Sequence, residues 1–195
     1  MKIGVIIYQN LTLLDLVGFT DAMHRLKTMH FLDDLSITYC GYTESCTDNY
    51  GFNLKADQIK SDLGAFDLIF VPGGFGTRDL IHDIDFIRWI QTARQVPLKV
   101  SVCTGSLILG AAGFLDHKKA TTHFNEYELL HQYTRDVIEA DIVEHEQIIT
   151  GGAVATSIIL GLHVCQKLAG KEAARQIAKR MGLPDIYQNA NVQVY

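Results

Sequence analysis

The sequence predicts an α/β protein whose mostly parallel sheet is covered by helices on both faces. Short apolar runs of the kind that form buried parallel strands recur at Lys2–Tyr8, Leu35–Cys40, Phe66–Val71 and Val100–Val102. Segments with the apolar spacing of helices separate these runs. Strands and helices that alternate along a chain without repeats or linkers favour a parallel sheet built from crossover units.

Length and composition indicate a single globular domain over residues 1–195. A chain of 195 residues should bury about 70% of its unfolded surface, enough for one core. Hydrophobic residues make up 48% and charged residues 20%, as in an ordinary globular protein. The net charge of -5 offers no basis for binding nucleic acid or an anionic membrane, so neither is expected as a partner.

Targeting and cysteine patterns favour a cytoplasmic protein. The apolar runs are too short to span a membrane, and Met1 leads directly into a strand rather than into a secretion signal. The four cysteines, Cys40, Cys46, Cys103 and Cys165, form no CxxC pair. The histidines are scattered without ligand spacing, so no metal site is assigned.

Several further helices and a turn are predicted in the first half of the chain. After a loop at Leu11–Leu14, a helix is predicted from about Asp15 to Leu26. A turn signal within Thr43–Asp62 indicates a small hairpin or an irregular excursion. A broad apolar face predicts one helix over Asp79–Arg94.

The second half is predicted to hold helices and short strands in alternation. In order, these are a helix at Ser106–Ala112, a polar crossing with a short central strand at Asp116–Phe124, a helix at Glu126–Gln132, strands at Asp141–Glu144 and Gln147–Thr150, a long apolar helix from Gly151–Gly152 to Leu168, and a last helix at Glu172–Met181 closed by Gly182–Pro184.

Cys103 is the candidate nucleophile. The strand Val100–Val102 turns at Cys103 straight into a helix, and Gly105 and Ser106 are small enough for a sharp elbow. The free N–H groups and the dipole of that helix would stabilise a thiolate, and such cysteines have a pKa lowered to roughly 3.5–7.5. The alternative is that Cys103 is a small buried core residue.

Asp15 is the candidate acid or base. Its apolar neighbours predict a dry environment, which favours the protonated carboxyl. A carboxyl beside a thiol can accept and return its proton, an effect that is worth about 10²–10⁴-fold in rate. The alternative is that Asp15 only caps the helix that begins near it. Because sites in parallel sheets form beyond the carboxyl ends of the strands, Asp15 and Cys103 should meet there.

Further candidates surround the elbow. The N–H groups of Gly73 and Gly74, with that of Thr104, could form an oxyanion hole, or the glycines could be a plain turn. The Thr104 hydroxyl could bond the sulfur or Asp15, or could cap the following helix. His123 could approach the sulfur, although a cap or a core contact is the alternative.

These motifs together support a family resemblance. They occur in the order Asp15, Pro72–Gly74, Val102–Ser106 and Thr121–His123. In this order, over roughly residues 3–168, the chain resembles the ThiJ/PfpI superfamily, whose fold is the flavodoxin-like three-layer sandwich of class I glutamine amidotransferases. It looks most like isocyanide hydratase and the amidotransferase-like domains of AraC-type regulators. It departs from hydratase-like members in having only apolar residues near Ile158–Ile159.

The resemblance implies a cysteine-dependent hydratase. Cys103 would attack the terminal carbon of an isocyanide, Asp15 would supply a proton and later activate water, and an N-formamide would be released without a cofactor. Gly73, Gly74, Thr104 and His123 would bind or stabilise the intermediate.

Two alternatives remain open. They are a glyoxalase or deglycase acting on 2-oxoaldehydes, and a ligand- or oxidation-sensing domain. Family members are usually homodimers, so a homodimer acting on a small electrophile is expected.

Overall fold

A mostly parallel sheet forms the centre of the protein, as predicted. The computed structural model describes residues 1–183 and 189–195. Its eight-stranded sheet has the order β10-β8-β9-β7-β6-β1-β2-β5, and only the pair β8–β9 is antiparallel. The strands are β1 (Lys2–Ile7), β2 (Ser36–Gly41), β5 (Gln58–Ile59), β6 (Leu68–Val71), β7 (Leu98–Val102), β8 (Ile142–His145), β9 (Ile148–Gly151) and β10 (Val192–Val194).

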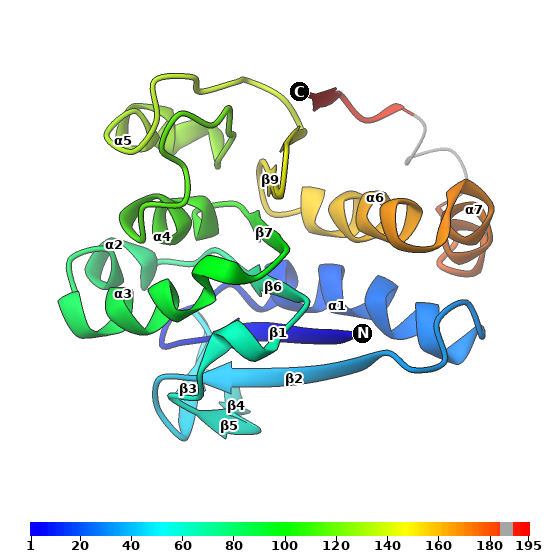
Figure 1. The fold of residues 1–195 in the computed structure, drawn as a ribbon, viewed down its shortest axis with the longest axis horizontal. Coiled ribbons are helices and arrows are strands. Elements are labelled where there is room, and N and C mark those ends of the chain that lie inside the picture. The colour runs from blue at the N-terminus through cyan, green and yellow to red at the C-terminus, as the bar shows by residue number, and fades with distance from the viewer. Residues whose placement is uncertain (184–188) are drawn as a thin grey trace.

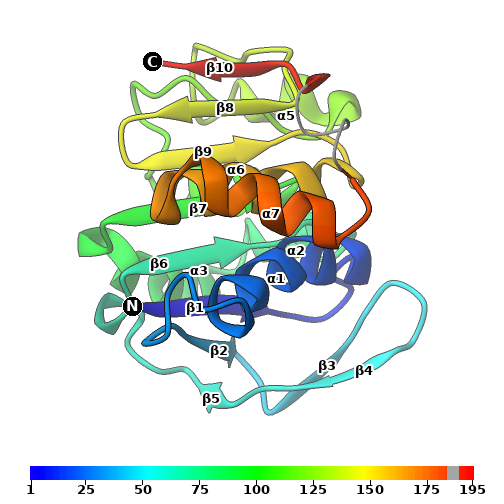
Figure 2. The same cartoon turned by 90° about the vertical axis from the view of Figure 1, so that its right-hand side faces the viewer.

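Helices cover both faces of this sheet (Figures 1 and 2). The helices α1, α6 and α7 lie on one face, and α2, α3 and α4 lie on the other. This is the three-layer α/β fold that the alternating pattern predicted. The helices are α1 (Leu13–Thr28), α2 (Thr77–Leu80), α3 (Ile84–Gln91), α4 (Gly105–Ala111), α5 (Tyr127–Leu130), α6 (Thr156–Ala169) and α7 (Lys171–Arg180), and the 3₁₀ helices are Leu63–Ala65, Thr92–Gln95 and Phe124–Glu126.

The centre of the sheet brings distant loops to one edge. Parallel pairing places β6 between β1 and β7. The carboxyl ends of these strands therefore lie side by side, and the segments that follow them carry Asp15, in the first turn of α1, and also Gly73–Gly74 and Cys103. The predicted hairpin is also present, as an antiparallel pair of β3 (Ser45–Thr47) and β4 (Asn53–Lys55).

Close packing of α1 against α6 fixes the helix that carries Asp15. A Cβ atom at Gly161 of α6 would lie 2.9 Å from Ala22 Cβ and 3.1 Å from Phe19 O, both on α1. Phe19 in turn stacks on Phe70 of β6, with ring centroids 3.9 Å apart. The absence of a side chain at Gly161 thus lets α1 pack close against α6, because side-chain volume sets the distance between packed helices.

Two predicted helix boundaries were wrong. The segment Asp79–Arg94 is broken into α2 and α3, because Asp83 is extended and its carboxylate accepts hydrogen bonds from Asp85 N and Phe86 N. Such a cap begins a new helix. The helix α6 begins at Thr156 rather than at Gly151–Gly152, because Gly151 is the last residue of β9.

Other differences between the predicted and the observed secondary structure are smaller. The crossing Asp116–Phe124 contains an isolated bridge from Ala120 to Val137 instead of a strand. The edge strand β10 was not predicted, because three residues are too few to show the apolar pattern of a strand. Pro184, expected to close the last helix, lies outside the described residues. None of the helices in the described part of the chain combines the length and hydrophobicity that a membrane crossing requires.

We expect Gly161→Val to destabilise the protein by about 1–3 kcal/mol, since added atoms must displace α1 from a close-packed interface. Chemical unfolding measures the effect. His24→Ala, at an exposed position of α1, is the matched control and should change stability by less than about 0.5 kcal/mol. Equal stability of Gly161→Val and the original protein would show that α1 and α6 are not held at this distance.

Candidate active site

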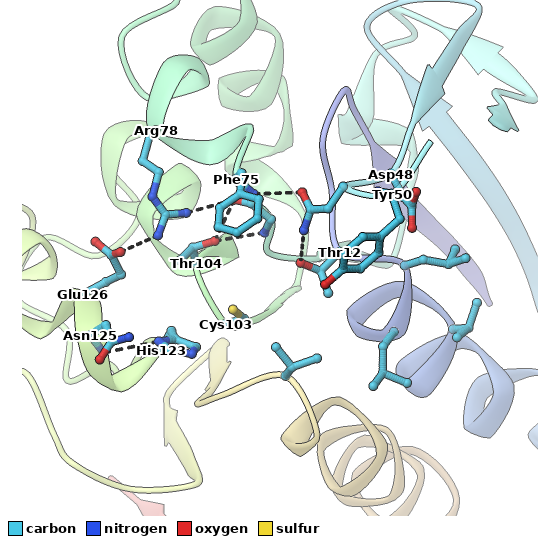
Figure 3. Close-up of a pocket in the computed structure, with 16 residues that line it drawn as sticks. Thr12, Asp48, Tyr50, Phe75, Arg78, Cys103, Thr104, His123, Asn125 and Glu126 are labelled. Atoms are coloured by element: carbon cyan, nitrogen blue, oxygen red, sulfur yellow. Dashed lines mark hydrogen bonds and ion pairs between the residues drawn. The ribbon is translucent and has the colours of Figure 1, made fainter. Parts of the chain in front are cut away.

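A cavity of about 670 Å³ lies at the carboxyl edge of the central strands. Figure 3 shows the Cys103 sulfur in its lining, with Arg78 and Glu126 on one side and Asp48 and Tyr50 on the other. The predicted convergence of the loops after β1, β6 and β7 is therefore present. The lining residues are Thr12, Leu13, Leu14, Val17, Asp48, Asn49, Tyr50, Gly74, Phe75, Arg78, Cys103, Thr104, His123, Asn125, Glu126 and Val154.

Cys103 sits on a strained elbow between β7 and α4. Its φ of 53° is in the left-handed region, which costs a non-glycine residue about 1–3 kcal/mol and persists only where the surroundings enforce it. Cys103 N donates to Gly151 O and Gly152 O, at 3.1 and 2.8 Å. Cys103 O accepts from the hydroxyls of Ser106 and Thr122, at 3.2 and 3.0 Å. These bonds hold the sulfur at the cavity, where the residue is 5% exposed.

Gly73 allows the carboxyl of Asp15 to reach the elbow. A Cβ atom at Gly73 would lie 2.7 Å from Asp15 Oδ2, from Cys103 Cβ and from Thr104 N. Any side chain here would separate these groups. Instead, Gly73 N donates to Asp15 Oδ2 at 2.9 Å and fixes the carboxyl beside the cysteine.

Asp15 does not cap its helix. It is fully buried in the first turn of α1, and Thr12 occupies the cap position. The second carboxyl oxygen, Oδ1, has no hydrogen-bond partner in the described residues. The Cys103 thiol hydrogen-bonds the same carboxyl, so the thiol is the group with which Asp15 can share a proton.

Burial raises the pKa of Asp15 to about 7, against which the hydrogen bond from Gly73 acts. A neutral carboxyl is thus accessible near physiological pH. This agrees with the dry environment that its apolar neighbours predicted.

The expectation of a lowered pKa for Cys103 was wrong. Burial, followed by the negative charge of Asp15, raises the pKa of the thiol to about 12, although the N–H and hydroxyl of Thr104 favour the thiolate. The helix α4 has only 7 residues, so its dipole does not overcome these effects. The resting pair is therefore a thiol beside a carboxyl that titrates near neutrality.

The N–H groups of Gly73 and Gly74, predicted as oxyanion donors, are both engaged within the protein in this structure. Gly73 N is engaged by Asp15, and Gly74 N donates to Thr104 Oγ1 at 3.0 Å. The two glycines therefore anchor Asp15 and Thr104. Of the proposed donors, the N–H of Thr104 is the one that faces the sulfur.

Thr104 and His123 both line the cavity. The Thr104 hydroxyl makes no cap bond to α4, so that alternative is excluded. His123 Nδ1 accepts from Asn125 N at 3.3 Å, and its ring stacks on Phe124. His123 therefore caps the 3₁₀ helix Phe124–Glu126, which was the alternative prediction for it. Its ring also borders the cavity.

Sequence reasoning missed much of the cavity wall. The ion pair between Arg78 of α2 and Glu126 of the third 3₁₀ helix joins segments far apart in the chain. Exposed apolar side chains at Leu14, Val17, Tyr50 and Phe75 border the opening. The turn signal at Asn49–Gly51 lies in this wall, but the sequence indicated only a small hairpin or an irregular excursion there. Within the described residues, no group of three or more acidic, histidine or cysteine side chains is arranged for a metal ion.

Comparisons with known proteins agree with the fold. Residues 1–167 match the DJ-1/PfpI family. The isonitrile hydratase of Pseudomonas putida is 32% identical over 180 residues, which are 91% of this chain and 76% of that protein. The crystal structure of a ThiJ/PfpI family protein from Pseudomonas syringae is 26% identical, with a TM-score of 0.81 over 93% of this chain and 74% of that one. An AraC family transcriptional regulator from Pseudomonas putida, at 16% identity, shares the fold, with a TM-score of 0.78 over 92% and 98% of the two chains.

The raised pKa of Asp15 predicts how the stability of the folded protein changes with pH. Between the ordinary aspartate pKa of 3.8 and about pH 7, the folded protein keeps a proton that the unfolded chain has lost. The stability contributed by this group is therefore present at low pH and is lost as pH rises through that interval. We expect Asp15→Asn to gain up to about 4 kcal/mol over the original protein between about pH 4 and pH 8.

Denaturant unfolding at a series of pH values measures this difference. Asp21→Asn, at an exposed position of the same helix, is the control. A stability difference between Asp15→Asn and the original protein that stays constant with pH would contradict a dry, proton-holding Asp15.

Proposed function

Because the chain belongs to the DJ-1/PfpI family, we propose that it is a hydratase that adds water to a small electrophile such as an isocyanide. The observation that carries this proposal is a buried carboxyl, Asp15, fixed by Gly73 beside the thiol of Cys103 in a cavity lining. The likeness to an isonitrile hydratase supports isocyanides as the substrate class. Addition of water to R–N≡C gives the N-formamide R–NH–CHO with no redox change, so the two side chains and water suffice.

The first step forms a thioimidate. Asp15 takes the proton of the Cys103 thiol as the sulfur attacks the terminal carbon, and an S–C bond forms. The same proton then passes from Asp15 to that carbon, which gives Cys103–S–CH=N–R. A carboxyl with a pKa of about 7 suits both transfers, because a group that titrates near the working pH accepts and donates a proton equally well.

The second step consumes water. The Asp15 carboxylate removes a proton from water, the hydroxide adds to the thioimidate carbon, and the proton goes to nitrogen. The tetrahedral adduct then loses its C–S bond, and the hydroxyl proton returns through Asp15 to the sulfur. The products are R–NH–CHO and the original thiol, so all atoms balance.

The cavity suits a neutral, apolar substituent. Its arginine, Arg78, is already paired with Glu126. The Asp48 carboxylate accepts from Tyr50 N and Phe52 N, at 2.9 and 2.8 Å. The remaining wall includes Leu14, Val17 and Phe75, which provide apolar contact area rather than a charged anchor.

We propose the cytoplasm as the setting and a homodimer as the assembly. All four cysteines are free and buried, as is usual in a reducing compartment. An oxidation sensor is less consistent with the site, since sensing cysteines have a low pKa and are accessible to solvent, whereas Cys103 is 5% exposed.

We expect turnover of a simple alkyl or aryl isocyanide to the N-formamide, measured by chromatography. Cys103→Ala should abolish it, and Asp15→Asn should reduce kcat/KM by about 10²-fold or more, because the proton relay is lost. Cys40→Ala removes a buried thiol that does not line the cavity and is the matched control.

Absence of turnover in the unaltered protein would overturn the substrate class. Lactate formation from methylglyoxal, dependent on Cys103, would then assign the site to 2-oxoaldehydes instead. Turnover that survives in Cys103→Ala would show that Cys103 is not the nucleophile.

A further inference from the structure

The peptide group between Pro72 and Gly73 is held by hydrogen bonds at both of its ends. Its N–H, from Gly73, donates to Asp15 Oδ2 at 2.9 Å. Its carbonyl, Pro72 O, accepts from the hydroxyl of Tyr8 at 2.6 Å. The N–H and the carbonyl of a trans peptide lie in one plane and point in opposite directions. The bond at the carbonyl therefore fixes the direction in which the N–H points.

This peptide group has more freedom to turn than an ordinary one. Proline fixes its own φ but leaves its ψ free. Glycine has no Cβ atom and accepts a wide range of φ. Rotation of the peptide plane changes only these two angles, the ψ of Pro72 and the φ of Gly73. The residues that let the backbone approach Asp15 so closely therefore do not by themselves keep the N–H turned toward it.

The surroundings of the Pro72 carbonyl make the Tyr8 hydroxyl important. Tyr8 is 3% exposed, and its ring packs edge-on against Phe86 with ring centroids 6.3 Å apart. A Cβ atom at Gly105, at the start of α4, would lie 2.7 Å from Pro72 O, so the backbone closes in on the carbonyl there. A buried carbonyl that loses its donor is destabilised. Without the hydroxyl, the peptide would gain by turning its oxygen toward another donor.

We propose that Tyr8 is a positioning residue that, by binding the Pro72 carbonyl, keeps the Gly73 N–H turned toward Asp15. When the hydroxyl is removed, the peptide can turn and bring its carbonyl toward the carboxyl instead. The carboxylate form of Asp15 then loses a donor, and the neutral form gains an acceptor. Both changes raise the pKa of Asp15. The consequence for catalysis rests on the proposed function, whereas the effect on the Asp15 proton does not.

Charge does not explain such an effect. Burial raises the pKa of Tyr8 well above its ordinary value of 10, so this residue stays neutral while Asp15 titrates. Replacement of Tyr8 by phenylalanine therefore removes a hydrogen bond and no charge. The other titratable groups that face Tyr8 and Asp15 or line the adjoining cavity are unaltered by it, and they are Cys46, Asp48, Arg78, Cys103, His123 and Glu126.

Infrared titration of the Asp15 carboxyl tests the effect on its proton. The carboxyl band is assigned as the one that is absent in Asp15→Asn. In Tyr8→Phe we expect the midpoint to rise from about 7 by about 1–2 pH units, as for loss of one hydrogen bond to a charged group. Tyr42→Phe is the matched control, because Tyr42 packs on the same Phe86 ring, at 5.8 Å, and does not line the cavity. It should leave the midpoint unchanged.

A second measurement follows the peptide group itself. Pro72–Gly73 is the one Pro–Gly pair in the sequence, so ¹³C-carbonyl proline and ¹⁵N-glycine together give a single correlated NMR signal. In the unaltered protein, this signal should titrate with the same midpoint as Asp15. Exchange of the Gly73 N–H with deuterated water should be about tenfold faster in Tyr8→Phe than in Tyr42→Phe. Thermal unfolding verifies that both variants are folded.

An unchanged Asp15 midpoint in Tyr8→Phe would overturn the inference, and so would unchanged exchange of the Gly73 N–H. A peptide signal that does not titrate in the unaltered protein would overturn it without any variant. A merely structural hydroxyl would lower thermal stability and leave the midpoint and the exchange rate as they were. Failure of the proposed function is separately visible, because neither measurement needs isocyanide turnover. Where turnover is present, the acid limb of kcat/KM should move upward with the Asp15 midpoint.

Discussion

The site depends on one bond, from Gly73 N to a carboxyl oxygen of Asp15 at 2.9 Å. This bond is possible because Gly73 has no side chain. A Cβ atom there would occupy the space shared by the Asp15 carboxyl, the Cys103 Cβ and the Thr104 N. The glycine thus brings together groups from the loops after β1, β6 and β7, and its N–H compensates part of the cost of burying a carboxyl.

The chemistry follows from this enclosure. A cysteine at the start of a long helix would ionise through the helix dipole. Here α4 is short, the sulfur is buried, and the neighbouring carboxyl opposes ionisation. In the proposed mechanism, the thiol therefore becomes reactive by transferring its proton to Asp15 at the moment of attack. Such a site avoids a permanent thiolate, the form that peroxide and other oxidants attack most readily.

Much of the fold and part of the site could be predicted from the sequence. The apolar strand runs and the strand-to-helix turn at Cys103 are local patterns, and the convergence of strand ends follows from parallel topology. Other features depend on segments that meet only in the folded chain. The raised pKa of Cys103, the engaged N–H groups of Gly73 and Gly74, and the pair between Arg78 and Glu126 are of this kind. The break at Asp83 was missed because the apolar face continues across it, although an aspartate is a common cap.

The most direct test of the account is infrared titration of the Asp15 carboxyl. The account predicts a protonated carboxyl band that disappears with a midpoint near pH 7, is absent in Asp15→Asn and shifts in Cys103→Ala. A carboxyl that is already ionised at about pH 5, as for an exposed aspartate, would contradict a dry acid that exchanges its proton with the cysteine.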